Sequence, residues 1–353
     1  MQPTTILLIC LFLFTTCIDR INLDETLSGE PILVVDGLMT NAEEPYRVIL
    51  SYTSSSLKTY QSDTLSGAEV YIADEAGNRA DLREVDNGVY QTDPSQFRGE
   101  VGRTYQLHIV APDGRAYVSL PETMPAVPPI DTIYFEASSE PRETSTATIL
   151  DEWGIRFFLD AGSGQSRAAY YRWSWRETYE FMAPLTQPTQ IFTPICYRSG
   201  IQVRDLNIAT TQDLRTDLIR RREINFVRKS GLQLQRRYSL LVKQYALTER
   251  AYAFWENVRE LQVDAGSVFA PPPSPIPGNM TSVDDEREQV LGYFQVSAVA
   301  EKRIFVTQSE LPPLPGGPFG SSLGCREGDP ELPGYCYDCT QLFGSTTEVP
   351  SFW

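Results

Sequence analysis

The segment YYRWSWRETYEF, residues 170–181, has the clearest strand pattern in the chain and decides its fold class. Aromatic side chains alternate with Arg and Ser, and the aromatic set is Tyr171, Trp173 and Trp175. Alternation with a period of two is typical of a β-strand that buries one face. We expect the three rings to lie in a core; the alternative is an exposed platform on which a sugar ring stacks. The segment predicts a β-rich domain.

Short strands also fill the region before this segment, residues 31–120. Runs of about 5 to 7 residues are separated by Gly, Asp, Asn and Pro, a spacing typical of a β-sandwich. In TYQLHIV, the positions expected to face the core are Tyr105, Leu107 and Ile109, and His108 lies on the opposite face. The sequence therefore predicts an N-terminal β-sandwich over residues 31–120.

Proline and helix signals divide the rest of the chain. The stretch 121–130 is rich in proline, which lacks the amide donor of a central strand, and is expected to be a linker. Residues 131–306 are expected to form a second β-rich domain with one main helix over 248–263, and residues 307–353 a tail rich in Pro, Gly and Cys. Thr248 is the expected N-cap of that helix. An apolar stripe follows at helical spacing: Ala251, Trp255, Val258 and Leu261.

The N-terminal segment has the features of an export signal. Residues 6–14, ILLICLFLF, form an apolar run that is too short to cross a bilayer as a helix. The four residues ending at Cys17, FTTC, resemble a lipobox, at which the signal peptide is removed and the cysteine is acylated. We expect residues 1–16 to be the signal peptide, Cys17 to carry lipid and residues 17–30 to be a tether. A buried N-terminal helix and a secreted chain without lipid are the alternatives.

Charge and histidine content exclude several classes of function. The 353-residue chain has a net charge of -16, so nucleic acid is not an expected partner, because binding a polyanion relies on Lys and Arg. His108 is the only histidine, which excludes any triad, metal site or proton relay that needs two. We expect His108 to face solvent, and we predict no metal site and no cofactor. Carboxylates are plentiful enough for a two-acid glycosidase site.

Two charged clusters are candidate sites. The basic zone could meet an acidic partner or an anionic glycan, although pairing with local acids is the favoured interpretation. It comprises Arg215, Arg220, Arg221, Arg222, Arg228, Lys229, Arg236, Arg237 and Lys243. The acidic cluster is interpreted as a solvated loop before a strand rather than as a calcium or catalytic site. It comprises Asp284, Asp285, Glu286 and Glu288.

Four cysteines are disulfide candidates. Cys10 lies in the expected signal peptide, which leaves Cys196, Cys325, Cys336 and Cys339 in addition to Cys17. An even set in an exported protein favours disulfides, with three possible pairings. If two bridges form, at least one tail cysteine must pair with Cys196. The alternatives for CYDC, residues 336–339, are half of a zinc site and a redox pair.

Several segments together carry a family resemblance. They are the lipobox, the strand PILVVDGLMT, the strand YYRWSW, the segment PGNMTSVDDEREQVLGYFQVSAV and the cysteine-bearing tail that ends in PSFW. In this combination the chain resembles a family of Bacteroidota outer-membrane lipoproteins, domain of unknown function 4249, over essentially the whole mature chain. The N-terminal domain is also similar to the immunoglobulin or carboxypeptidase-regulatory type of β-sandwich.

The resemblance implies a location and a kind of partner, but no catalytic residue. It implies a lipid-anchored outer-membrane protein, often encoded near a TonB-dependent receptor. We therefore expect a non-enzymatic accessory protein that binds a TonB-dependent transporter and helps nutrient uptake. A structural or adhesive surface protein is one alternative, and a carbohydrate-active enzyme with paired carboxylates is another. The sequence assigns no ligand, no oligomeric state and no face of the membrane.

Overall fold

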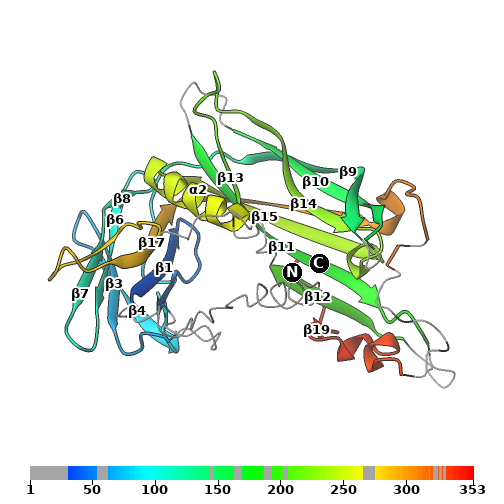
Figure 1. Ribbon diagram of the computed structural model, residues 1–353, viewed down its shortest axis with the longest axis horizontal. Helices are drawn as coiled ribbons and strands as arrows, with labels where there is room; N and C mark the ends of the chain where they lie inside the picture. Colours follow the sequence, from blue (N-terminus) through cyan, green and yellow to red (C-terminus); the bar gives the residue numbers. More distant parts are fainter. Residues whose placement is uncertain are drawn as a thin grey trace, which may run out of the picture.

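The computed structural model is mainly β, and its described residues form two β modules with one α-helix, α2, between them (Figure 1). Among the described residues, no helix has both the length and the apolar composition to cross a bilayer. The predicted signal peptide, Cys17 and the tether lie outside the described residues. Those residues are 31–53, 63–143, 147–162, 169–186, 193–201, 206–264, 275–317, 319–320, 325, 328 and 331–353.

The N-terminal module is one ten-stranded sheet in the order β16-β7-β6-β3-β4-β5-β2-β1-β17, with β8 beside β6. The first half of β4 pairs with β3 and its second half with β5, so the sheet folds over into two layers around one core. The strands are β1 (Leu33–Thr40), β2 (Arg47–Tyr52), β3 (Glu69–Asp74), β4 (Arg79–Asp86), β5 (Val89–Gln91), β6 (Thr104–Val110), β7 (Ala116–Ser119), β8 (Glu122–Thr123), β16 (Met280–Ser282) and β17 (Val290–Ser297).

Alternate side chains of these strands fill the core, as the period of two predicts. In β6 the buried positions are Tyr105, Leu107 and Ile109, as expected from the sequence. The sheet nearly closes, because Asn279 exchanges two hydrogen bonds with the backbone of Phe294, at 2.8 and 2.9 Å. The prediction of an N-terminal sandwich is therefore confirmed in its architecture.

Strands β16 and β17 correct the predicted domain boundary. The sequence assigned residues 131–306 to the second domain, but β17 pairs in parallel with β1, from Leu33 opposite Val290 onward, and β16 pairs with β7. Gly292 permits the close approach, because a Cβ there would lie 1.9 Å from the Val35 carbonyl oxygen. Pairing between such distant segments leaves no trace in local periodicity. Residues 280–297 thus complete the sandwich predicted over 31–120.

The second module packs two sheets around one apolar core. Their orders are β14-β10-β9 and β18-β15-β11-β12-β19, with β13 also pairing with β11. β11 contains the segment that predicted a β-rich domain, and it pairs with β15 along most of its length. The strands are β9 (Ile130–Glu143), β10 (Ile149–Ala161), β11 (Tyr170–Met182), β12 (Ile195–Ile201), β13 (Asn207–Thr210), β14 (Ile219–Arg228), β15 (Arg237–Leu247), β18 (Val299–Thr307) and β19 (Ser345–Thr346).

Helix α2, Glu249–Asp264, lies where the two modules meet (Figure 1). It confirms the helix predicted over residues 248–263. The Thr248 hydroxyl oxygen accepts a hydrogen bond from the Ala251 amide at 3.1 Å, so Thr248 is the N-cap as predicted. Apolar side chains of α2 pack against residues of both modules, among them Tyr245 of β15 and Tyr293 of β17.

The predicted linker, residues 121–130, is held at both ends rather than free. Its first residues form β8, which pairs with β6. Near its other end, the Gln244 side chain donates a hydrogen bond to the Pro128 carbonyl at 2.9 Å. Further along, the chain passes from β17 to β18 through the buried Ala298. These two crossings are therefore packed segments, and a third crossing, from β15 to β16, runs through α2.

The described part of the tail packs on the second module. Disulfides join Cys196 to Cys339 and Cys325 to Cys336, which confirms that a tail cysteine pairs with Cys196. All four thiols are therefore used, and the zinc and redox alternatives for CYDC are wrong for this structure. β19 adds to the edge of β12. The 3-10 helices are η3 (Leu232–Leu234), η4 (Gln308–Glu310), η5 (Gly334–Cys336) and η6 (Cys339–Gln341).

Candidate functional site

A cavity of about 440 Å³ lies where the two modules and α2 meet. Its size falls within the range of about 300–1,000 Å³ that is usual for small-molecule sites. One wall is the outer face of β1, β2 and β17, a second is β11, and a third is α2. The side chains used below are Asp36, Leu38, Arg47, Ile49, Arg172, Trp255, Val258 and Gln295.

Strand alternation explains how these side chains reach the cavity. In β1 the odd-numbered residues are buried in the sandwich, so Asp36 and Leu38 point away from that core. The register of β1 and β2 places Ile49 opposite Asp36 and Arg47 opposite Leu38. In β11 the aromatic positions face the core of the second module, so Arg172 points out of it on the other face. The outer faces of two sheets therefore oppose each other across the cavity.

Arg172 is a cationic residue of the cavity lining that lies against two aromatic rings. Its guanidinium carbon lies 4.9 Å from the centroid of the Tyr245 ring and 4.6 Å from that of the Trp255 ring. Its Nε atom is buried and, within the described part of the chain, has no hydrogen-bond partner. Burial lowers the pKa of Arg172, while the neighbouring Tyr245 and Asp36 favour its charged form. A guanidinium offers a planar fork of donors that matches a carboxylate, so this arrangement suits an anion.

A chain of hydrogen bonds holds the Trp255 ring in place. The indole Nε1 donates to Gln295 Oε1 at 2.8 Å, and Gln295 Nε2 donates to the Ser297 hydroxyl at 2.8 Å. Gln295 is only 1% exposed, so its amide is well shielded from water. These bonds tie α2 to β17 and fix the flat indole as a wall of the cavity.

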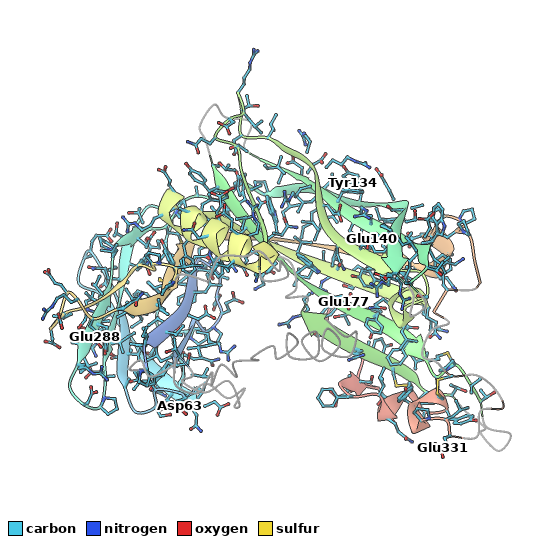
Figure 2. The ribbon with its side chains drawn as sticks, in the orientation of Figure 1. Asp63, Tyr134, Glu140, Glu177, Glu288 and Glu331 are labelled. Atoms are coloured by element: carbon cyan, nitrogen blue, oxygen red, sulfur yellow. A yellow bond between two sulfur atoms is a disulfide. The ribbon has the colours of Figure 1, made fainter. Side chains whose placement is uncertain are left out.

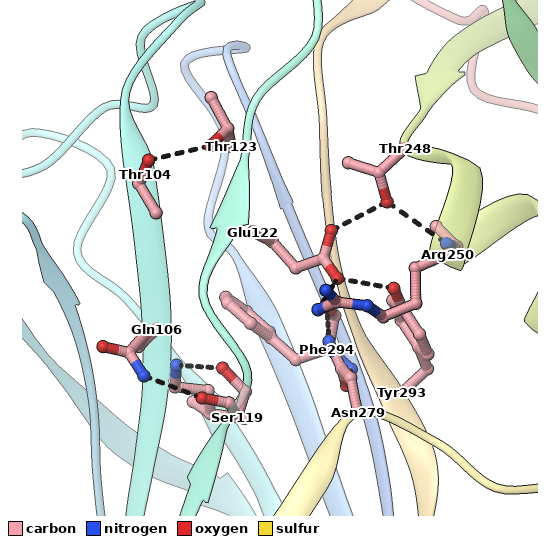
Figure 3. Close-up of polar contacts among 12 residues, drawn as sticks. Thr104, Gln106, Ser119, Glu122, Thr123, Thr248, Arg250, Asn279, Tyr293 and Phe294 are labelled. Carbon is pink, nitrogen blue, oxygen red and sulfur yellow. Dashed lines mark hydrogen bonds and ion pairs between the residues drawn. The ribbon is translucent and has the colours of Figure 1, made fainter.

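Glu122 fixes the start of α2 against the N-terminal module. Figure 3 shows its carboxylate accepting hydrogen bonds from the Tyr293 hydroxyl at 2.6 Å and the Thr248 hydroxyl at 2.8 Å, and pairing with Arg250 at 3.3 Å. Glu122 is 2% exposed. Burial, together with the negative charge of Glu122, raises the pKa of Tyr293. A buried carboxylate is tolerated only while it is hydrogen-bonded, so these contacts hold the helix in one position.

A second hollow, a polar cleft of about 650 Å³, lies entirely in the second module. Two of its glutamates, on β9 and β11, are labelled in Figure 2. Arg156 bridges two of the glutamates across the sheet: it pairs with Glu140 at 2.9 Å and with Glu223. The glutamates of the polar cleft are Glu140, Glu152, Glu177 and Glu223.

The remaining two glutamates of the polar cleft are also engaged. Glu152 pairs with Arg142 at 3.4 Å and with Arg228 at 3.1 Å. Glu177 is 5% exposed and accepts a hydrogen bond from the Tyr238 hydroxyl at 3.1 Å. Burial and the charge of Glu177 raise the pKa of Tyr238. All four carboxylates of the polar cleft therefore have partners within the protein.

The three aromatic residues proposed as a ligand platform are buried. Tyr171, Trp173 and Trp175 are 0%, 2% and 6% exposed. The Tyr171 hydroxyl donates to Asp217 at 2.8 Å, and the Trp173 indole donates to Gln244 at 2.9 Å. The platform is therefore wrong and the core interpretation is confirmed, because side chains on the inner face of β11 lie under the opposing sheet.

The basic zone does not form an uncompensated cationic surface. Four of its arginines pair with carboxylates: Arg220 with Asp131, Arg221 with Glu136, Arg228 with Glu152, and Arg236 with Glu180. Arg222 donates to the Asn207 side chain at 2.7 Å, and Arg237 lies over the Phe305 ring. Lys229 is buried and donates to three backbone carbonyls of the tail. A partner-facing role is therefore wrong for Lys229, and the interpretation as pairing with local acids fits the four paired arginines.

His108 was predicted to face solvent, but its side chain is partly buried. It lies on the face of β6 opposite the core, where its ring stacks on Tyr71 at 4.6 Å between centroids. The Arg79 guanidinium covers the same tyrosine ring, at 3.6 Å. Burial, and next the charge of Arg79, lower the pKa of His108.

The acidic cluster holds a loop. Asp284 accepts a hydrogen bond from the Ala116 amide at 3.1 Å. Glu288, labelled in Figure 2, accepts from the Tyr117 hydroxyl at 2.8 Å and from Arg115 at 2.9 Å. These contacts fasten the loop between β16 and β17 to β7, which agrees with the loop interpretation.

The amino-acid sequence does not reveal the cavity. It places Arg172 on the polar face of a strand and Trp255 in the apolar stripe of a helix, and both placements are right locally. A cation on a strand whose other face is aromatic is a weak signal of a second buried face. No local pattern brings β1, β11 and α2 together, because that contact depends on the return of β17 to the first module.

Comparison with known families shows which family the chain matches. A family described as a domain of unknown function, DUF4249, matches residues 18–303, which include α2 and most strands of both modules. Comparison with curated proteins gives no match. The matched range also contains every wall of the cavity. The chain belongs to the DUF4249 family.

Proposed function

We propose that this chain is a non-enzymatic binding protein, anchored by lipid in the outer membrane, that acts beside a TonB-dependent transporter in nutrient uptake. The observation that carries the proposal is the cavity between the two modules. It holds a stacked arginine whose buried Nε has no partner in the described part of the chain. Arg172 lines this cavity, and a guanidinium there can bind an anionic ligand.

Two features support export and anchoring. The apolar segment that ends at Cys17 has the order of residues of a lipobox. The disulfides Cys196–Cys339 and Cys325–Cys336 suit an oxidising compartment such as the periplasm or the cell surface. Acyl chains contribute about 0.8 kcal/mol per buried methylene, so a multiply acylated Cys17 would hold the protein stably at a membrane.

Anchoring is tested with a radioactive fatty acid. Cells that make the wild-type protein should incorporate label into it and retain it in the outer-membrane fraction, and Cys17→Ser should abolish both. Cys10→Ser is the matched control, because Cys10 lies in the expected signal peptide. Equal labelling of Cys17→Ser and wild type would refute the anchor.

The transporter partnership is tested by pull-down. The acylated protein, purified from detergent-solubilised outer membranes, should bring a TonB-dependent receptor with it. A deletion strain should lose uptake of a nutrient. Normal uptake with altered attachment to surfaces would instead favour a structural or adhesive protein, and the absence of any receptor from the pull-down would contradict the partnership.

The polar cleft favours one second candidate, a carbohydrate-active enzyme with paired acids. Four glutamates line one hollow, which is the residue type that such chemistry uses. Their pairing with arginines and with Tyr238 fits a structural role at least as well. Purified protein should be incubated with a panel of glycans. Hydrolysis that is lost in both Glu177→Gln and Glu223→Gln would establish the enzyme, and no hydrolysis of the panel would eliminate it.

A further inference from the structure

We infer that the cavity between the modules binds an organic monocarboxylate with a flat apolar body, and that Arg172 holds its carboxylate. The inference deepens the proposed function by naming the ligand class, and it rests on that function only for delivery of the ligand to a transporter.

The other buried cations of the fold show that Arg172 is an exception. Lys229 donates to three tail carbonyls, at 2.7, 3.0 and 3.2 Å. Arg222 donates to the Asn207 side chain at 2.7 Å and to the Ile208 carbonyl at 3.0 Å. The Arg172 guanidinium lies close to two rings, and its buried Nε meets no acceptor among the described residues. The ring contacts fix where the guanidinium lies, at the lining of the cavity.

Charge favours a single negative group. Among the described residues, the ionisable side chains that line the cavity are Arg172, Arg47 and Asp36. These three sum to one positive charge, which one carboxylate balances. A dianion such as phosphate would leave excess negative charge in a partly enclosed site, which is unfavourable. The planar fork of an arginine also matches a carboxylate with two parallel hydrogen bonds.

The rest of the lining is apolar or flat. Leu38 and Ile49 contribute from the N-terminal module, and Val258 contributes from α2. The Trp255 indole is fixed by its hydrogen bond to Gln295, so it presents a rigid face on which a ring can stack. A volume of about 440 Å³ suits a small molecule rather than a polymer. An aromatic or branched acid therefore satisfies both the cation and the walls.

The test compares an acid with its amide. The acylated full-length protein in lipid nanodiscs is titrated with 4-fluorophenylacetate and with 4-fluorophenylacetamide, and binding is followed by ¹⁹F NMR against empty nanodiscs. The two probes differ only in the charged group that Arg172 would hold. We expect the acid to bind at least tenfold more tightly than the amide, because a hydrogen bond to a charged group adds roughly a factor of 10 to 100 in affinity.

Matched variants locate the effect. Arg172→Gln should reduce the affinity for the acid to that for the amide. Arg176→Gln should leave it unchanged, because Arg176 is an exposed residue of the same strand and does not line the cavity. If Arg172→Gln fails to fold by circular dichroism, Val258→Trp gives the second test, because it keeps Arg172 but fills the cavity and should abolish binding.

Three results would overturn the inference. They are equal binding of acid and amide, unchanged affinity in folded Arg172→Gln or Val258→Trp, and tighter competition by inorganic phosphate than by the acid. The outcome is separate from that of the proposed function. If the acid binds as expected but no receptor is found in the pull-down, only the transporter partnership is refuted. If a receptor is found but the acid does not bind, only the ligand class is refuted.

Discussion

The cavity and the polar cleft are both lined by charged side chains, but these side chains differ in whether they have partners within the protein. In the polar cleft, Arg156 lies between Glu140 and Glu223, and the other two glutamates have partners as well. In the cavity, the Arg172 guanidinium lies against the Tyr245 and Trp255 rings, and its buried Nε meets no acceptor in the described structure. The four glutamates of the polar cleft are paired, whereas the Arg172 Nε has no acceptor among the described residues. The buried Nε1 of Trp175, a residue that lines both hollows, has none there either.

The difference shows which hollow to test first for binding. Ion pairs that are internally satisfied hold a fold together or orient its strands, and they need no ligand. A buried donor without an acceptor lowers stability, so its presence calls for a compensating role. The size of a hollow does not make this distinction, because the polar cleft is the larger of the two.

Breaking the long disulfide should have the largest effect, and it should act on the module of the polar cleft alone. Cys196→Ser with Cys339→Ser opens a link between residues 143 apart in sequence, and we expect the free energy of unfolding to fall by about 2–5 kcal/mol. Cys325→Ser with Cys336→Ser is the matched control, and it should cost less because its residues are only 11 apart. Urea denaturation measures both. The reverse ranking would contradict the expectation.

Removing Glu122 should have the next largest effect, and it should act on the cavity rather than the polar cleft. Glu122→Ala leaves the buried Tyr293 hydroxyl and the Thr248 hydroxyl without their acceptor. We expect a loss of about 2–3 kcal/mol in urea denaturation and weaker binding of 4-fluorophenylacetate, because α2 is no longer held. Glu43→Ala, at an exposed position, should change stability by less than about 0.5 kcal/mol. Unchanged stability of Glu122→Ala would remove the proposed role of Glu122.

A pair of arginine substitutions tests the comparison directly. Arg156→Met strands two glutamates of the polar cleft and should lower the free energy of unfolding by about 1 kcal/mol, a value reduced because both carboxylates are partly exposed. Arg172→Met removes an unsatisfied donor and keeps apolar contact with Tyr245 and Trp255. Its stability should stay the same or rise. Thermal denaturation checks both, and a fall for Arg172→Met as large as that for Arg156→Met would contradict the distinction.

The smallest expected effect is a pH dependence that belongs to neither hollow. The pKa of His108 is lowered in the folded state, so the unfolded chain binds its proton more readily. Stability from this group is present above about pH 6.5 and falls as the pH drops below that value. His108→Gln should reduce the change of the denaturation midpoint with pH between about pH 5 and 7. Binding of the acid should stay constant from about pH 6 to 8, because His108 does not line the cavity.

Local features of the fold were predictable because they depend on neighbours in sequence. The alternation in YYRWSW identified β11 and its buried face, and Thr248 identified the start of α2. Cysteine counting predicted a bridge from the tail to Cys196. Each of these predictions needs only strand or helix periodicity, capping chemistry or an even number of thiols.

Features that depend on distant pairing were not predictable. Parallel pairing of β17 with β1 moved residues 280–297 into the first module, and no property of either strand names its partner. The cavity follows from that pairing, because β17 carries Gln295 and lies beside α2. The sequence alone places Arg172 on a strand. It does not predict that Arg172 faces a second sheet.

The parallel seam between β1 and β17 has a consequence for the order of assembly. β1 is made early in synthesis, but one of its two edges is paired only after β17, residues 290–297, has been made. Until then one edge of β1 offers unpaired amides and carbonyls, which other extended chains can bind. We therefore expect a chaperone to protect this edge of β1 until β17 has been made. A chain truncated before residue 290 would lack β17, and this edge of β1 would stay unpaired.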